Sequence, residues 1–207
     1  MSRRARTAAR LWRAQQERDP FVQRARREGF RARSVYKLEE IDRRLRLLRP
    51  GLFVLDLGAA PGSWSQYAVR RGCRVVAVDR IPMDPIEGVE IIQGEVGAPE
   101  LADALTERWG RCFDVVLSDL APATSGQADL DRLRSEALVE EVLALSERLL
   151  KPGGDVLVKL LKGAEAHIAQ IARPRFDRIR HLRPKATRKR SSELYLLLTG
   201  LRPEAEA

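Results

Sequence analysis

The chain has 207 residues, of which 44% are apolar and 32% charged, and this composition can support one sizeable α/β core. No apolar run approaches the roughly 18 residues of a membrane-spanning helix, and the N-terminus lacks the apolar core of a secretory signal. These features argue against a membrane protein and a secreted protein, so we expect a cytoplasmic one.

Charge is distributed unevenly along the chain. The formal net charge is +9, but residues 1–46 carry 15 Lys/Arg against 6 Asp/Glu, and residues 173–190 carry 9 against 1. The remainder is acidic, with 14 basic and 22 acidic residues. One basic run alone could be a solvated face, whereas two arginine-rich segments on an acidic body indicate a polyanionic partner, most simply nucleic acid.

The first predicted elements are a basic arm and an amphipathic helix. Residues 1–20 are polar and basic, which indicates a frayed helix or an arm. From Ser34 to Leu48 apolar residues recur every three or four positions, which predicts a helix with Ser34 as its N-cap. Pro50-Gly51 is expected to end this helix. We therefore divide the chain into a basic arm, residues 1–33, and one domain, residues 34–207.

Strands and helices alternate over the next part of the chain. Predicted strands are residues 52–57, 74–79, 88–94, 113–119 and 155–161, and predicted helices are residues 64–71, 99–110, 132–150 and 163–173. Residues 175–184 and 193–200 read as two further strands joined by a basic loop. The alternation predicts an α/β fold with a doubly wound, mostly parallel sheet, whose ligand lies at the carboxyl ends of the strands.

The cysteines and histidines give no sign of a metal site. Cys73 and Cys112 lie far apart beside apolar runs, which favours reduced thiols over a disulfide. His167 and His181 have no metal-ligand spacing to each other or to the cysteines. We expect no metal.

A glycine loop follows the first strand. In "LDLGAAPGSW" the strand ends near Asp56, and Gly58 to Gly62 form the turn into a helix. The G-x-G-x-x-G of a dinucleotide enzyme and the G-K-[ST] of a phosphate loop are both missing. Pro61 also removes one amide donor. The loop therefore suits a ligand without a pyrophosphate, and a dehydrogenase is disfavoured.

Acidic residues end the next two strands. Asp79 lies 21 residues after Gly58, where a carboxylate can accept both hydroxyls of a ribose, and Glu95 is placed to lie near an adenine. An adenosine without phosphates plus a zwitterionic group is S-adenosylmethionine. The alternative is a bare doubly wound domain that uses these acids as helix caps.

The sequence resembles the FtsJ/RrmJ family of ribosomal RNA ribose 2′-O-methyltransferases. The matching motifs run in order from "DPFVQRARREGFRARSVYKLEEID" through "LDLGAAPGSWSQ", "LSDLAPATSG" and "VKLLKG" to "RKRSSELYLL", covering nearly the whole chain after about the first 18 residues. The resemblance implies a Rossmann-like S-adenosylmethionine-dependent methyltransferase fold whose C-terminal strand is antiparallel. Two departures are Ser63, where the family usually has glycine, and Glu95, where it usually has aspartate.

The resemblance also implies the site residues. The cofactor would be S-adenosylmethionine, bound by Gly58, Gly62, Trp64, Asp79, Glu95 and Asp119. The catalytic set would be Lys37, Asp119, Lys159 and Glu193. A ribose hydroxyl must lose a proton to attack a sulfonium methyl, and a lysine can serve as general base when burial or a second cation favours its neutral form. We expect Lys159 to be that base and Lys37 to give electrostatic support.

The two basic segments would then hold RNA. The candidates are Arg24, Arg26, Arg27, Arg31, Arg33, Arg188, Lys189 and Arg190. The implied target is a uridine in the A-loop of 23S rRNA, in the 50S ribosomal subunit, and a monomer is expected. Two alternatives stay open: a tRNA ribose 2′-O-methyltransferase and a non-catalytic RNA-binding assembly factor.

Overall fold

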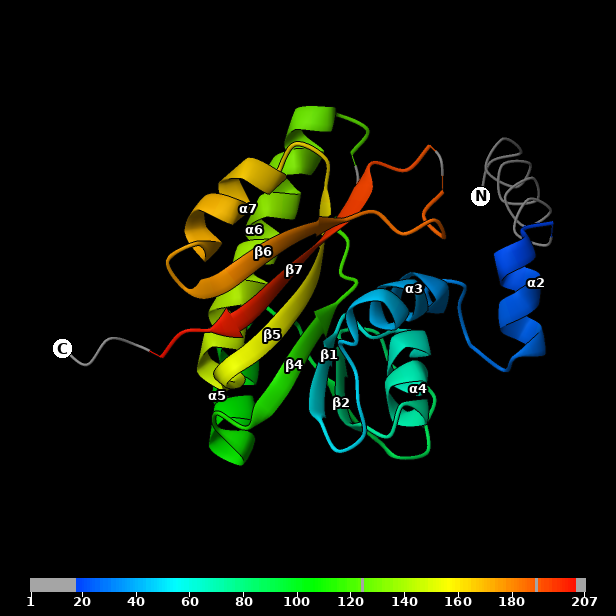
Figure 1. Cartoon of the computed structure of the whole chain (residues 1–207), viewed down its shortest axis with the longest axis horizontal. Coiled ribbons are helices and arrows are strands. Elements are labelled where there is room, and N and C mark those ends of the chain that lie inside the picture. Colours follow the sequence, from blue (N-terminus) through cyan, green and yellow to red (C-terminus); the bar gives the residue numbers. More distant parts are fainter. Residues whose placement is uncertain (1–17, 124, 189, 204–207) are drawn as a thin grey trace.

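The computed structural model describes residues 18–123, 125–188 and 190–203 (Figure 1). Within these residues seven strands form one sheet in the order β3-β2-β1-β4-β5-β7-β6. The strands are β1 Phe53–Leu57, β2 Arg74–Asp79, β3 Val89–Gln93, β4 Phe113–Ser118, β5 Leu150–Leu161, β6 Phe176–Leu182 and β7 Glu193–Leu201. The strand β7 is antiparallel to both of its neighbours, while the other described strands run parallel to one another. The predicted fold, including the antiparallel C-terminal strand, is confirmed.

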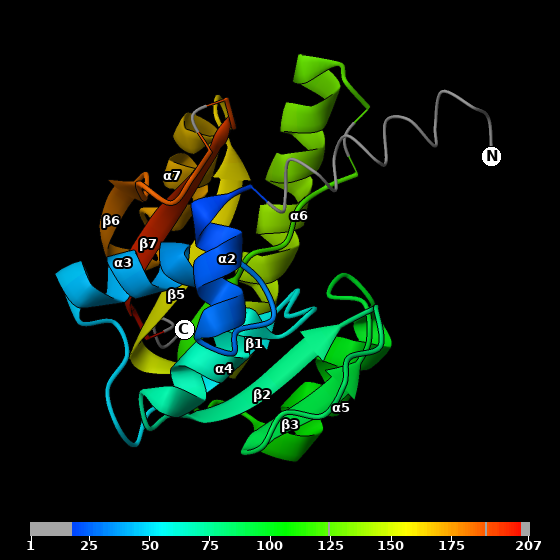
Figure 2. The ribbon, with the colours of Figure 1, turned by 90° about the vertical axis from the view of Figure 1, so that its right-hand side faces the viewer.

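Helices cover both faces of the sheet (Figures 1 and 2). They are α2 Pro20–Arg27, α3 Val35–Leu45, α4 Ser63–Arg70, α5 Pro99–Trp109, α6 Ala128–Leu149 and α7 Glu165–Ala172. One apolar core joins α5, α6 and α7 to the sheet, and a second joins α3 and α4 to the opposite face. The strand β1 is covered on both faces and its five residues are all buried, which explains their nearly unbroken apolar run. Among the described residues, no helix has the length and apolar character needed to cross a membrane.

The helix α3 is shorter than predicted. It begins at Val35 and ends at Leu45, because Arg46 adopts the left-handed conformation with φ of 54°. Leu48 then donates its N–H to Asp42 Oδ1 at 2.7 Å and is buried outside the helix. Ser34 occupies the N-cap position but makes no side-chain cap; its Oγ lies 2.9 Å from Ser63 Oγ instead. The predicted N-cap position of Ser34 is therefore confirmed, but its hydroxyl makes no capping hydrogen bond.

The helix α6 ends at Leu149, one residue before the predicted end, and β5 starts at Leu150. The predicted strand began at residue 155. The register between β4 and β5 shifts in this region, from Phe113↔Leu150 to Val115↔Asp155, so that "KPGG" forms an irregular start of the strand. Glycine and proline mark a bulge here as well as the end of a helix.

The described end of the basic arm packs onto the domain. Asp19 accepts the N–H of Phe21 at 3.0 Å and caps α2, and the ring of Phe21 lies 5.6 Å from that of Tyr36 in α3. Arg70 of α4 donates to the carbonyl of Glu28 at 3.0 Å. Figure 2 shows α2 beside α3 and α4. The helix α2 is thus held by the same elements that carry the predicted site.

Candidate active site

The carboxyl ends of the parallel strands border a cleft of about 500 Å³. Its lining includes four of the predicted cofactor residues, Gly58, Asp79, Glu95 and Asp119. The helix α6 forms the opposite wall through Arg134, Ala137, Leu138 and Glu141. The cleft lies where the strand order reverses between β1 and β4, the usual position for a ligand in an open α/β sheet.

The glycine loop forms one end of the cleft. Gly58 has φ of 73°, and an added Cβ would overlap the side chain of Leu120. Gly62, with φ of 107°, is the N-cap of α4, where a Cβ would meet Ile86 and Arg31. Trp64 is buried, and its Nε1 donates to the carbonyl of Ser34 at 2.9 Å. The structure thus places Gly58 in the cleft wall, Gly62 at the start of the next helix and Trp64 in the core.

Asp79 is fixed by the backbone around it. Its Oδ2 accepts from the N–H of Ala60 at 2.8 Å, and its Oδ1 accepts from the N–H of Ile81 at 2.8 Å. Each carboxylate oxygen keeps a further lone pair for a ligand. Asp79 therefore ties the glycine loop to the end of β2 and still presents an acceptor to the cleft.

Two further acidic residues, Glu95 and Glu141, line the cleft. The side chain of Glu95 is 71% exposed, and its Oε1 lies 4.0 Å from Arg80. Partial burial and the carboxylate of Glu95 raise the pKa of Glu141. Glu141 packs against Gly97, where an added Cβ would lie 2.7 Å from its Oε2. Sequence reasoning missed Glu141, because a glutamate in a long amphipathic helix reads as a solvated residue.

Asp56, at the end of β1, is a buried acid next to the loop. Burial raises its pKa to about 7. Ser65 Oγ donates to its Oδ2 at 2.5 Å, whereas its Oδ1 has no hydrogen-bond partner in the described chain. Asp56 thus links β1 to the first turn of α4.

The four predicted catalytic residues come together at the other side of the cleft. Lys159 Nζ donates to the carbonyl oxygen of Asp119 at 2.6 Å and lies 3.0 Å from its Oδ1. Lys37 Nζ donates to Glu193 Oε2 at 2.9 Å and lies 4.0 Å from Asp119 Oδ1. Both lysines are only 8% exposed. Side chains from α3, the end of β4, β5 and the start of β7 thus form one lysine–carboxylate cluster.

Tyr195 completes this cluster and was not predicted. Its hydroxyl donates to Asp119 Oδ1 at 2.7 Å. Burial raises its pKa well above the ordinary value, and the charge of Asp119 adds to this shift, so the phenol stays protonated. Tyr195 pairs directly with Lys159 in the β5–β7 ladder. Its position two residues after Glu193, on the same face of a strand, was the signal available in the sequence.

Glu193 is held in its ionised form. Burial alone would raise its pKa, but the charge and hydrogen bond of Lys37, followed by the charge of Lys159, outweigh burial and lower it. The cluster therefore places two lysine side chains against two carboxylates, those of Asp119 and Glu193.

A basic pocket of about 470 Å³ opens onto the cluster. It is lined by Arg33, Ser34, Lys37, Arg188, Arg190, Ser191 and Glu193. Arg33 pairs with Asp19 and also donates to the carbonyl of Ala186, while Arg188 lies 3.6 Å from Asp19. Both basic segments of the sequence thus contribute arginines to one pocket beside Lys37.

The other predicted RNA-binding residues lie elsewhere. Arg31 donates to the carbonyls of Pro61, Asp84 and Pro85, which fixes the loop after β2. Arg24 pairs with Glu28 and Glu39, and Arg26 and Arg27 are exposed on α2. Lys189 falls outside the described residues. Within the part of the chain that is described, no group of three or more His, Cys, Asp or Glu could hold a metal ion.

The chain is similar in sequence and in structure to proteins of one known family. Residues 30–201 match the model of the FtsJ-like methyltransferase family. A Verminephrobacter eiseniae protein named Ribosomal RNA large subunit methyltransferase E is 47% identical over 204 residues, covering 96% of this chain and 84% of its own. The protein of the same name from Gluconobacter oxydans is 42% identical over 200 residues, covering 96% and 75%. A crystal structure from Plasmodium falciparum, described as a ribosomal RNA methyltransferase, is 28% identical with a TM-score of 0.75, covering 83% of this chain and 98% of that one.

Proposed function

The chain belongs to the FtsJ-like methyltransferase family, and from this premise we propose that it methylates a ribose 2′-hydroxyl of large-subunit ribosomal RNA with S-adenosylmethionine as donor. The observation that carries the proposal is the position of Asp119. This residue lines the cleft and also binds Lys159, so a methyl donor in the cleft and a proton acceptor in the cluster would share one neighbour. As the finer target we propose a uridine of the 23S rRNA A-loop within the 50S subunit, which the family resemblance implies.

The cleft suits S-adenosylmethionine. Asp79 offers fixed carboxylate oxygens for the ribose hydroxyls, and the glycine at position 58 lets the ligand approach the backbone closely. Acids dominate the strand ends around the cleft, which disfavours a pyrophosphate and favours a ligand with a cationic sulfonium. When bound, the cofactor supplies an electrophilic methyl group on that sulfonium.

Lys159 is placed to accept the hydroxyl proton. A neutral amine has two N–H donors, and the carbonyl and Oδ1 of Asp119 lie within 2.6 and 3.0 Å to receive them. The nitrogen lone pair would then remain free to accept the proton of the ribose hydroxyl. Tyr195 in turn holds Asp119 through a hydrogen bond. Asp119, fixed in this way, would set the orientation of the Lys159 amine and of its lone pair.

Lys37 is better suited to electrostatic support. Its Nζ donates to the ionised Glu193 at 2.9 Å, so the side chain is held in place by an acidic partner. A fixed cation beside the attacking oxygen would stabilise the alkoxide character that develops there. Lys37 also lines the basic pocket, so it can contact the presented nucleotide.

The basic pocket would receive the target nucleotide. Arg33, Arg188 and Arg190 can donate to the phosphates on either side of the ribose. Arginines that contact the backbone set position rather than read bases, so we expect the surrounding RNA fold to supply selectivity.

The test is methyl transfer from labelled S-adenosylmethionine to ribosomal subunits and to tRNA, followed by mass mapping of the modified nucleotides. We expect one ribose methyl group in the large-subunit RNA. Methylation of tRNA alone would show that the substrate is tRNA and not ribosomal RNA. Methylation of a base would contradict the ribose assignment. Binding without transfer to any RNA would indicate an assembly factor.

A further inference from the structure

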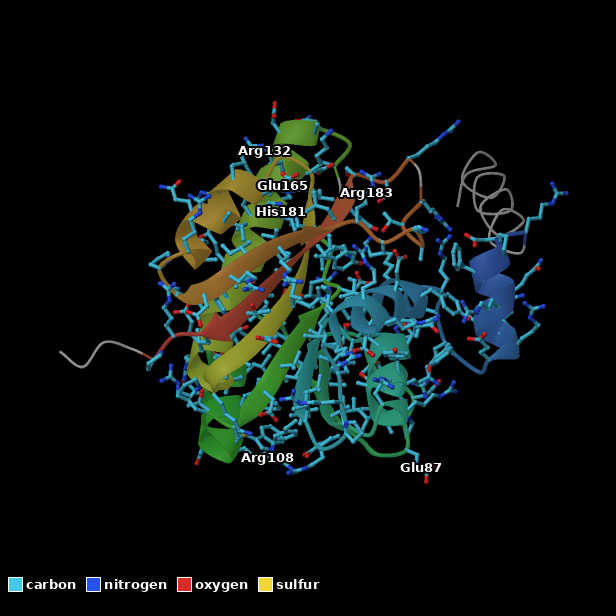
Figure 3. The ribbon with its side chains drawn as sticks, viewed as in Figure 1. Glu87, Arg108, Arg132, Glu165, His181 and Arg183 are labelled. Carbon is cyan, nitrogen blue, oxygen red and sulfur yellow. The ribbon has the colours of Figure 1, made fainter. Side chains whose placement is uncertain are left out.

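A third pocket lies at the end of the sheet where β5, β6 and β7 meet. This rear pocket has a volume of about 220 Å³ and is lined by Lys162, Glu165, His181, Leu182, Arg183 and Leu194. Its residues come from the end of β5, the start of α7, the end of β6 and the start of β7. In Figure 3 Glu165, His181 and Arg183 lie together at the end of β6, with Arg132 of α6 close by.

The rear pocket is close to the predicted catalytic residues. Glu193 and Leu194 are consecutive in β7, so their side chains leave the strand on opposite faces from Cα atoms about 3.8 Å apart. Glu193 binds Lys37 on one face, and Leu194 lines the rear pocket on the other. The loop after β6, which carries Arg188 and Arg190, passes between the two pockets.

The charge of the rear pocket favours an anion. Within the described chain, the side chains of Lys162 and His181 make no ion pair or hydrogen bond. The single lining acid, Glu165, accepts the N–H of Gly163 and is occupied locally. Arg183 is oriented by donating to the carbonyl of Ser191 at 2.9 Å, and the N–H of Lys162 binds the carbonyl of Ser192 at 2.8 Å. The side chain of Arg183 and the backbone of Lys162 are thus tied to the loop that borders the basic pocket, and the side chains of Lys162 and His181 stay available to a ligand.

We propose that the rear pocket is a second phosphate-binding site, which holds the RNA strand after it has passed over the loop between β6 and β7. Lys162 and Arg183 would bind the phosphate, and His181 would add a donor. The proposal rests on the proposed function, because it requires an RNA substrate in the basic pocket. A strand held on both sides of the loop would be bent over the sheet edge, which would present one ribose to Lys159.

The test uses Lys162→Gln, because the Lys162 side chain has no described partner whose loss could disturb the fold. RNA affinity is measured over a range of salt concentrations with protein-free ribosomal RNA and with ribosomal subunits, together with kcat and KM. We expect the magnitude of the negative slope of log affinity against log salt to decrease by about 0.7–0.9. The KM for RNA should rise, whereas kcat and the affinity for S-adenosylmethionine should stay unchanged. Lys162→Arg should restore the slope.

The matched control is Lys151→Gln, which removes the same charge at the other end of β5, where Lys151 pairs with Asp114. The control should keep the parent slope. A Lys162→Gln protein with the parent slope and KM would overturn the proposal, as would an effect seen with subunits but not with protein-free RNA, since the pocket would then contact a protein. If the parent transfers no methyl group to any RNA, the proposed function fails, while the binding slopes still decide on the pocket.

Discussion

At the scale of single residues, Asp119 connects the two halves of the site. It lines the cleft, accepts from Tyr195 and lies within 4.0 Å of both lysines. Because the carboxylate of Asp119 also has Tyr195 and Lys37 as neighbours, Lys159 can be replaced without isolating it, whereas replacing Lys37 removes the ion-pair partner of Glu193. This makes Lys159 suitable for testing by mutation.

Lys159→Ala should fold and bind S-adenosylmethionine but lose methyl transfer by about 10²–10⁴-fold, the usual effect of removing a general base. Single-turnover transfer to ribosomal subunits measures this loss, and Lys37→Ala is the comparison. We expect the Lys37 variant to retain more activity, because its proposed role is electrostatic. Near-normal transfer by Lys159→Ala would shift the role of base to Lys37.

Asp79→Ala should weaken the binding of S-adenosylmethionine by roughly 1.5–3 kcal/mol, since the ribose would lose a charged acceptor. The glycine loop would also lose its bond from Ala60 to Asp79. Calorimetry on the protein without RNA gives the affinity. Asp103→Ala, at an exposed acid on α5 paired with Arg148, is the control and should bind normally. Unchanged affinity in Asp79→Ala would place the cofactor elsewhere.

Glu193 should make the free energy of unfolding depend on pH. Its pKa is lowered in the folded protein, so its pair with Lys37 stabilises the fold above the unfolded pKa of about 4.3, and this stabilisation is lost as pH falls through the lower folded value. Glu193→Gln should cost roughly 1 kcal/mol at pH 7 and progressively less below about pH 4. Urea unfolding of both proteins from pH 7 to pH 3 measures the difference. An equal difference at every pH would contradict a role for the charge.

At the scale of elements, the strongly patterned segments could be predicted and the local exceptions could not. The strands around β1 are buried on both faces, so their sequences are almost wholly apolar and easily identified. The end of α3 depends on Arg46 in a left-handed conformation, for which an arginine gives no signal. Of the site, the glycine loop and strand-end acids could be found from spacing. For Tyr195 the sequence offered only its alternation with Glu193 along a strand, and for Glu141 it offered no signal, because both roles arise only when β7 and α6 are placed beside other elements.

The basic arm can be tested as an element. Residues 1–17 carry five arginines and one glutamate, whereas residues 18–33 pack onto α3 and α4. Deletion of residues 1–17 should leave the melting temperature and S-adenosylmethionine affinity unchanged and lower the salt slope of RNA binding by about 0.7–0.9 for each lost phosphate contact. Deletion of residues 1–33 should in addition lower the melting temperature, because Phe21 and Phe30 cover Tyr36. If the shorter deletion keeps the parent slope, residues 1–17 do not contact RNA.

At the scale of the whole molecule, the two basic segments meet although they are far apart in the sequence. Arg33 lies before the first strand and Arg188 lies in the last loop, yet both approach Asp19 and line the same pocket. The two basic segments of the chain therefore form one cationic pocket next to the lysines, on a domain that is otherwise acidic. Composition alone predicted the kind of partner, and the fold supplies the place where the partner would bind.

The position of β7 has a consequence for synthesis of the protein. This strand lies inside the sheet between β5 and β6, and its first residue, Glu193, is a member of the lysine–carboxylate cluster. A nascent chain that has not yet released residue 193 from the ribosome would leave β5 as an open sheet edge. That edge is rich in buried apolar residues, including Val156, Leu157 and Val158, and would pair readily with other chains. Synthesis of β7 is thus needed both to cover this edge and to complete the proposed active site, and truncations that remove β7 should aggregate rather than persist as inactive folded proteins.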